Sequence, residues 1–253
     1  MHELNGKVAV ITGASRGIGA AAAVEFANKG VRVVLAARSI DDLQSVAAQV
    51  RAAGGEVAVA QCDVTSFADV EAAIAGAERE FGGFDIMVNN AGAIDPIARL
   101  SESDPEAWVR AADVNYKGVY FGLRAALPRL TRQGTGVVVN VSSGAAVGVM
   151  EGWSHYCSAK AAALSLTRAA HLECAADGVR IVGLSPGTVM TEMQVLIKAS
   201  GINPVSQLDP SVHIPPQWAG QAIVWLCTDA ARKYDGTDFA LKSDAARREI
   251  GLL

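Results

Sequence analysis

The sequence predicts an α/β fold of one domain: a doubly wound (Rossmann) parallel sheet of seven strands with helices on both faces. Two observations predict it. Apolar segments alternate with helical ones along the whole chain, and most apolar segments are hydrophobic without interruption, as strands covered on both faces are. No linker or change of composition divides the chain, so residues 1–253 are expected to fold as one domain.

The expected strands and helices can be placed in chain order. The strands are Val8–Thr12, Val31–Ala37, Val57–Gln61, Asp85–Asn89, Gly136–Ser142, Val179–Ser185 and Thr237–Leu241. Ser39 with Asp42, and Ser66 with Asp69, fit the capping box that starts a helix, and the segment 103–106, Ser-Asp-Pro-Glu, is interpreted as a third. Glycine tolerates the left-handed conformation, so helices are expected to end at Gly30, Gly54, Gly82, Gly134 and Gly178.

Two helical segments have too few polar residues for an ordinary surface helix. The segment 119–130 has two charged residues, both arginines, and the segment 161–176 has one arginine and one glutamate. Such helices are either buried within the chain or packed between the sheet and a second subunit. We favour the second alternative, which predicts a homo-oligomer, a dimer or tetramer, formed through these two segments.

Composition and charge argue against several classes of protein. Lys and Arg number 22 against 26 Asp and Glu, giving a net charge of −4 without a basic run, so no nucleic-acid partner is expected. The longest uncharged segment, Gln133–Met150, is too polar to span a membrane, and no apolar stretch before Lys7 indicates a signal peptide. Four cysteines without C-x-x-C spacing predict reduced thiols in a cytoplasmic protein. No metal-ligand cluster is expected.

A glycine-rich segment follows the first strand and precedes an alanine-rich helix. Glycine lets a backbone turn sharply and approach a pyrophosphate, and the free N–H groups of the helix start attract negative charge. A dinucleotide site is therefore predicted, the alternative being a plain tight turn. Its candidate residues are Gly13, Ser15, Arg16, Gly17, Ile18 and Gly19.

The end of the second strand discriminates between the two nicotinamide dinucleotides. NAD sites commonly place Asp or Glu there, but this chain has Ala37 followed by Arg38. A guanidinium binds a 2′-phosphate that a carboxylate would repel, and Arg16 could add a second cation. NADP(H) is therefore predicted rather than NAD(H), unless Arg38 is only a solvated residue that opens the next helix.

Tyr156 and Lys160 are separated by one helical turn, so they share a helix face. A free phenol has a pKa near 10, and lowering it to about 7 requires about 4 kcal/mol of preference for the phenolate. A nearby ammonium, together with the positive ring of an oxidised nicotinamide, could supply much of this in a shielded site. The pair is therefore a candidate proton donor with its activating cation.

These motifs together resemble the short-chain dehydrogenase/reductase family, and they keep that family's order and spacing over residues 7–230. The motifs are Thr12-Gly13-Ala-Ser-Arg-Gly17-Ile-Gly19, Asn89-Asn90-Ala91-Gly92, Asn115, Ser143, Tyr156-x-x-x-Lys160 and Pro186-Gly187.

The resemblance implies hydride transfer between NADP(H) and a small carbonyl compound or secondary alcohol. Tyr156 would be the general acid in reduction and the base in oxidation, and Lys160 would lower its pKa and hold the nicotinamide ribose. Ser143 would hydrogen-bond the reacting oxygen, and Asn115 would anchor a water that relays protons to Lys160. Taken alone, Ser143 could equally cap a strand end and Asn115 could be structural.

The resemblance also implies further cofactor contacts, with the adenine after the third strand and with the nicotinamide amide after the sixth. These candidates are Asp63, Val64, Asn90, Ala91, Gly92, Pro186, Gly187, Val189 and Thr191. Residues 188–216 would form a mobile lid over the substrate. Its apolar residues could line a substrate pocket or merely pack: Met190, Met193, Leu196 and Ile197.

Some features of the chain leave alternatives open. Trp153 and His155 adjoin Tyr156, and for each we favour a surface or packing role over substrate contact. The segment 234–253 departs from the glycine-rich ending common in the family, which leaves oligomer geometry and substrate open. A non-catalytic dinucleotide sensor or scaffold on the same fold is an alternative function, but it would typically have lost one of the residues proposed for catalysis. An epimerase or dehydratase is a third alternative.

Overall fold

Seven parallel strands form one sheet in the computed structural model, which describes residues 3–253. The strands lie in the order β3-β2-β1-β4-β5-β6-β7. Their bounds are β1 Val8–Thr12, β2 Arg32–Ala37, β3 Val57–Gln61, β4 Ile86–Asn89, β5 Gly136–Val141, β6 Val179–Ser185 and β7 Asp238–Ala240, one residue from the prediction wherever an end differs. The predicted doubly wound sheet is confirmed, and a crevice forms where the chain winds away from β1 and β4 in opposite directions.

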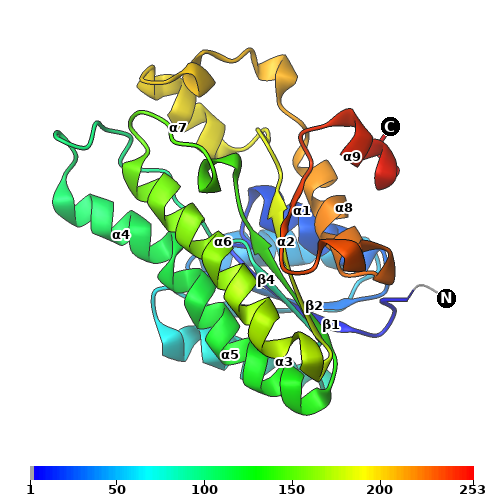
Figure 1. The fold of residues 1–253 in the computed structure, drawn as a ribbon. Helices are drawn as coiled ribbons and strands as arrows, with labels where there is room; N and C mark the ends of the chain where they lie inside the picture. Colours follow the sequence, from blue (N-terminus) through cyan, green and yellow to red (C-terminus); the bar gives the residue numbers. More distant parts are fainter. Residues whose placement is uncertain (1–2) are drawn as a thin grey trace.

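Helices cover both faces of the sheet (Figure 1). Their bounds are α1 Gly17–Ala27, α2 Ile40–Ala52, α3 Phe67–Phe81, α4 Pro105–Asn115, α5 Lys117–Gln133, α6 Ser154–Cys174, α7 Glu192–Ser200, α8 Pro216–Leu226 and α9 Asp244–Glu249. α1, α2 and α8 pack against one face, and α3, α5 and α6 against the other. Alternate strand residues enter the two cores, as Ile11 and Val10 of β1 do, which explains the uninterrupted apolar strands.

The serine caps of two of the three predicted capping boxes are confirmed, and the third is wrong by one residue. Ser39 and Ser66 accept the first-turn hydrogen bonds as expected. At α4 the cap is Asp104, whose carboxylate accepts a hydrogen bond from the Ala107 N–H at 2.7 Å. Pro105 has no N–H and a fixed φ, so it takes the first helical position and makes the residue before it the cap. Ser103 instead donates to the Leu100 carbonyl.

The two apolar helical segments lie in α5 and α6, although α6 stops at Cys174, before the end of the predicted segment. Both pack their inner sides into one core, but neither is wholly buried within the chain. Tyr120 of α5 is 45% exposed, and Leu172 of α6 is 86% exposed. The alternative of complete burial within one chain is therefore wrong, and contact with a second subunit stays a prediction.

The four cysteines are buried free thiols, as the sequence predicts. Burial raises the pKa of Cys62 and that of Cys227 to about 12, so neither is a reactive thiolate at neutral pH. None of the helices within residues 3–253 has the length and hydrophobicity that a membrane crossing requires.

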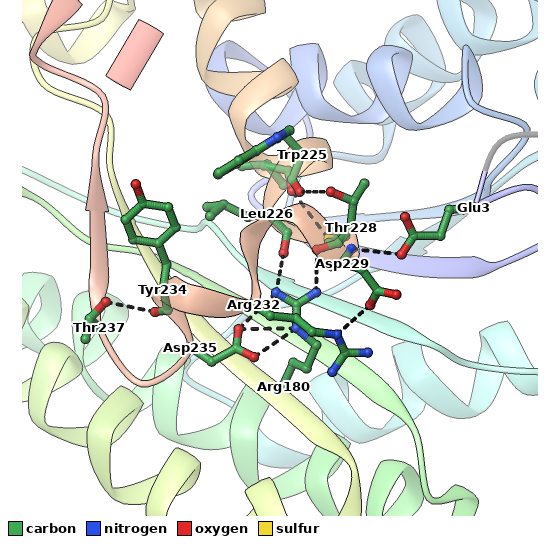
Figure 2. A network of polar contacts seen from close by, with 12 residues as sticks. Glu3, Arg180, Trp225, Leu226, Thr228, Asp229, Arg232, Tyr234, Asp235 and Thr237 are labelled. Atoms are coloured by element: carbon green, nitrogen blue, oxygen red, sulfur yellow. Dashed lines mark hydrogen bonds and ion pairs between the residues drawn. The ribbon is translucent and has the colours of Figure 1, made fainter. Parts of the chain in front are cut away.

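A buried ion pair anchors the segment that leads into the last strand (Figure 2). Arg180 of β6 is 6% exposed, and its guanidinium donates to both carboxylate oxygens of Asp235 at 2.9 Å. The same guanidinium donates to the carbonyls of Thr228 and Leu226 at the end of α8. Gly236 then donates its N–H to the Ile181 carbonyl, so the chain enters β7 from a fixed point.

Candidate active site

A cleft of about 2560 Å³ runs along the carboxyl ends of the strands, beside the glycine-rich segment and beneath residues 188–216. Pockets for small molecules usually measure about 300–1,000 Å³, so this one has room for a dinucleotide and a second molecule. All candidate site residues predicted from the sequence line it except Gly19 and Asn115.

The glycine-rich segment is built so that backbone can approach a ligand. Gly13 and Gly17 have φ of +62° and +56°, a region that favours glycine, and a Cβ on Gly13 would lie 2.7 Å from Cα of Ala91. Gly19 lies outside the cleft because it packs α1 against the carbonyl of Gly13. The Asn90 amide donates to the carbonyls of Thr12 and Gly13 at 2.9 and 3.0 Å, which fixes the start of the turn. The segment therefore fits a pyrophosphate at the start of α1.

The two arginines predicted to bind a 2′-phosphate have different surroundings. Arg38 follows β2, is exposed and lines the cleft. Its charge contributes to the lowered pKa of Asp63, after the dominant hydrogen bond from the Thr65 N–H. Arg16 forms an exposed ion pair with Glu192 of α7. A carboxylate thus already balances the charge of Arg16, and Arg38 is the better candidate for a phosphate.

Tyr156 and Lys160 lie in the first turns of α6, 8% and 3% exposed. The Lys160 ammonium is 5.6 Å from the centre of the Tyr156 ring and donates to the Val141 carbonyl at 2.7 Å. Ser143 follows β5, and its hydroxyl accepts a hydrogen bond from the Ala145 N–H at the start of a short 3-10 turn. The tyrosine, the lysine and the serine therefore lie together at one side of the cleft.

Burial shifts the pKa of both ionisable groups toward the neutral form. It raises the pKa of Tyr156, and a hydrogen bond with Ser143 opposes this. It lowers the pKa of Lys160 to about 8, and the charge of Asp238 opposes that shift. The pair alone therefore does not create the acidic phenol expected from the spacing, because burial raises the pKa of the Tyr156 hydroxyl. An acidic phenol needs a further positive charge in the cleft, as an oxidised nicotinamide would provide.

The side chain of Asn115 is buried and bonded within the protein. Its amide donates to the carbonyls of Ala93 and Ala111 at 2.6 and 2.9 Å, and its oxygen accepts from the Ala93 N–H at 3.2 Å. These bonds tie the end of α4 to the segment after β4. The role of Asn115 in holding a relay water stays a prediction.

An apolar cluster forms the other end of the cleft, beneath α7, which projects beyond the end of the sheet (Figure 1). Its members come from five separate segments: Ile94, Ile97, Ala145, Trp153, Tyr156, Cys157, Met193, Ile197 and Val205. The Trp153 ring meets the Tyr156 ring edge-on, with centroids 5.8 Å apart, so Trp153 lines the cleft. His155 is buried outside it near Trp108, where it packs as favoured.

The sequence reading missed several lining residues. Ile94 and Val205 belong to segments far apart along the chain, and no motif connects them. Lys242 and Arg247 also line the cleft, from the C-terminal segment that departs from the expected ending. For four apolar residues of the segment 188–216, the sequence left open whether they line a pocket or only pack. They line the cleft: Met190, Met193, Leu196 and Ile197.

Comparison with known proteins places the sequence among dehydrogenases. A family model described as short chain dehydrogenase matches residues 7–200. A 2,5-dichloro-2,5-cyclohexadiene-1,4-diol dehydrogenase of Sphingobium indicum is 33% identical over 246 residues, covering 95% of this chain and 96% of that protein. A cyclohexanol dehydrogenase of Acinetobacter sp. strain SE19 is 30% identical over 243 residues, covering 95% of each.

Solved structures share the fold. A short-chain type dehydrogenase/reductase from Mycobacterium marinum has a TM-score of 0.87 and 31% identity, covering 95% of both chains. An NAD+-bound xylitol dehydrogenase also has a TM-score of 0.87, with 25% identity, covering 94% of this chain and 98% of that one.

Proposed function

This chain belongs to the short-chain dehydrogenase family and is an oxidoreductase of alcohol and carbonyl groups; from that premise we propose that it transfers a hydride between NADP(H) and an apolar secondary alcohol or ketone. The observation that carries the proposal is one cleft lined by the glycine-rich segment, by Tyr156, Lys160 and Ser143, and by an apolar cluster.

The cofactor proposal rests on residues that line the cleft at the start of α1, after β2 and after β6. A bound nicotinamide dinucleotide supplies the hydride donor or acceptor. The start of α1 and the glycine-rich segment would hold its pyrophosphate, and Pro186 and Gly187 would hold its amide. Arg38 supports NADP(H), because it lines the cleft where NAD sites commonly carry an acid.

Residues of the protein would transfer the proton to and from the substrate oxygen. In reduction, the Tyr156 hydroxyl donates its proton to the carbonyl oxygen as the alcohol forms, and in oxidation the phenolate takes it back. Ser143 donates a hydrogen bond to the same oxygen, and the Lys160 ammonium stabilises the phenolate.

The substrate class follows from the apolar end of the cleft. Aliphatic and aromatic side chains surround Tyr156 there, and Trp153 lines the cleft beside it. Two of the relatives are named for alicyclic alcohols or diols, which such a surface suits. We therefore propose that the substrate is a ring-containing ketone or secondary alcohol that carries no charged group near its reacting carbon.

The test measures steady-state rates of oxidation and reduction with a panel of cyclic and linear alcohols and ketones. The near-ultraviolet absorbance of the reduced nicotinamide reports each rate. We expect cyclic apolar compounds to react fastest. Tyr156→Phe should lower kcat by about 10²–10⁴-fold while leaving the Kd for NADPH unchanged. The matched control is Tyr120→Phe, at an exposed tyrosine of α5. Cofactor binding without turnover of any compound would contradict the proposal and favour a sensor.

A further inference from the structure

Asp238 of β7 lies behind the candidate active site. Its Oδ2 accepts a hydrogen bond from the hydroxyl of Ser142 at 2.5 Å. Its Oδ1 is buried and has no hydrogen-bond partner within residues 3–253. Ser142 directly precedes Ser143 at the end of β5, so this carboxylate is connected to the segment that carries the catalytic serine. Nothing in the sheet itself requires an acid at this position.

The carboxylate reaches Ser142 by crossing the strand between them. β6 separates β5 from β7, and Gly183 of β6 pairs with Asn140 on one side and with Asp238 on the other. A Cβ on Gly183 would collide with Oδ1 of Asp238. Glycine is needed here for space and not for an unusual backbone, so Gly183 and Asp238 form one arrangement.

Two anchors hold Asp238 in place. The network of Figure 2 fixes Asp235 against Arg180, just before β7 begins. Gly183 also donates its N–H to the Thr237 carbonyl, so the chain is bonded to β6 directly before Asp238. Both anchors directly precede Asp238 and fix where β7 begins.

Asp238 and Lys160 interact electrostatically. Burial lowers the pKa of Lys160 to about 8, and the field of Asp238 opposes this. The pKa of Asp238 is itself raised by burial, against the Ser142 hydrogen bond and the charges of Lys160 and Arg168. The ionisable groups around this pair are thus Tyr156 next to Lys160 and Arg168 acting on Asp238. The neutral hydroxyls of Ser142 and Ser143 lie on the side of β5.

We propose that Asp238 is a positioning residue of this site, which favours the ammonium form of Lys160 by its charge and fixes the end of β5 through Ser142. The proposal rests on the proposed function, because the ammonium matters through its effect on the Tyr156 phenolate. Asp238 touches neither the cleft's reacting groups nor a ligand, so it acts through its neighbours.

The first test measures the pKa of Lys160 in the protein without cofactor, so it does not depend on turnover. Protein labelled with ¹³C-lysine is titrated by NMR, and Lys160→Met assigns the signal. Asp238→Asn keeps the shape and the ability to accept from Ser142 but removes the charge, so the pKa of Lys160 should fall by about one unit. The matched control, Asp229→Asn, alters an exposed carboxylate that faces Arg232 and should leave the pKa of Lys160 unchanged. An unchanged or raised pKa in Asp238→Asn overturns the proposal.

The second test is the pH dependence of kcat/KM. Because a smaller fraction of Lys160 is then charged, the ionisation of Tyr156 should move to higher pH in Asp238→Asn and stay in place in Asp229→Asn. If the profile does not move although the pKa of Lys160 has fallen, the positioning role is wrong. A wild-type protein inert toward every alcohol and ketone would instead defeat the proposed function, while the cofactor-free titration would still decide whether Asp238 acts on Lys160.

Discussion

At the scale of single residues, burial sets the properties of the site. Tyr156 and Lys160 are both shifted toward neutral forms by the low polarity around them. We therefore expect the ionisation of Tyr156 to depend on the charged groups close to it and to Lys160. One is Asp238 behind the lysine, and another is the positive nicotinamide ring that the cleft would admit. We therefore expect the phenol to become acidic only when the oxidised cofactor binds.

The prediction for cofactor choice concerns Arg38. Replacing it with alanine removes a charge-assisted bond to a 2′-phosphate, each of which contributes about 1.5–3 kcal/mol, so the Kd for NADPH should rise roughly 10- to 100-fold. The Kd for NADH should stay within a factor of two or so, because that cofactor has no 2′-phosphate. Fluorescence titration of both reduced cofactors measures this, with Arg51→Ala, an exposed arginine of α2, as control. Tighter binding of NADH than of NADPH by the wild type would contradict the assignment.

At the scale of elements, the last strand depends on one buried ion pair. Arg180 joins β6 to the end of α8 and to the segment entering β7. Because Asp235 is largely buried, removing its partner leaves a carboxylate with little water to solvate it. The pair thereby connects the stability of the sheet edge to the position of Asp238.

Arg180→Met is therefore expected to lower the free energy of unfolding by about 3–5 kcal/mol. Arg232→Met breaks an exposed pair with Asp229 and should change it by about 0.5 kcal/mol or less. Urea unfolding followed by circular dichroism compares the two variants. Equal effects of both substitutions would show that the buried pair does not hold the edge.

Elements were easier to predict than the contacts between them. The strands were placed to within one residue because burial on both faces leaves an uninterrupted apolar run, as in the Val-Ala-Val-Ile of β1. The α4 cap was misplaced because the fixed geometry of Pro105 outweighed the serine signal. The raised pKa of Tyr156 could not be predicted, since spacing shows that Lys160 is near but not that burial of the phenol dominates its pKa. Ile94 and Val205 meet only through the fold.

At the scale of the whole molecule, α5 and α6 suggest how copies of the chain associate. Both helices are apolar on their inner sides and expose Tyr120 and Leu172 on their outer sides. Exposed apolar residues next to small ones, such as Ala169 of α6, allow a second helix to approach closely. This supports the predicted homo-oligomer.

Ala169→Glu should therefore shift the protein to a smaller species in sedimentation velocity, because it places a charge within the expected interface. Ala52→Glu, at an exposed position of α2, should leave the sedimentation coefficient unchanged. A wild type that sediments as a monomer, or an Ala169→Glu variant that sediments as the wild type does, would remove these helices from the interface.

The measurement that bears most directly on the central claim is the pKa of the Tyr156 hydroxyl in the presence of NADP+. It can be obtained from the ultraviolet difference spectrum between wild type and Tyr156→Phe across a pH titration. We predict that the hydroxyl ionises well below the value of about 10 found for free tyrosine when the oxidised cofactor is bound, and above it when no cofactor is present. A pKa at or above that of free tyrosine with NADP+ bound would contradict the account.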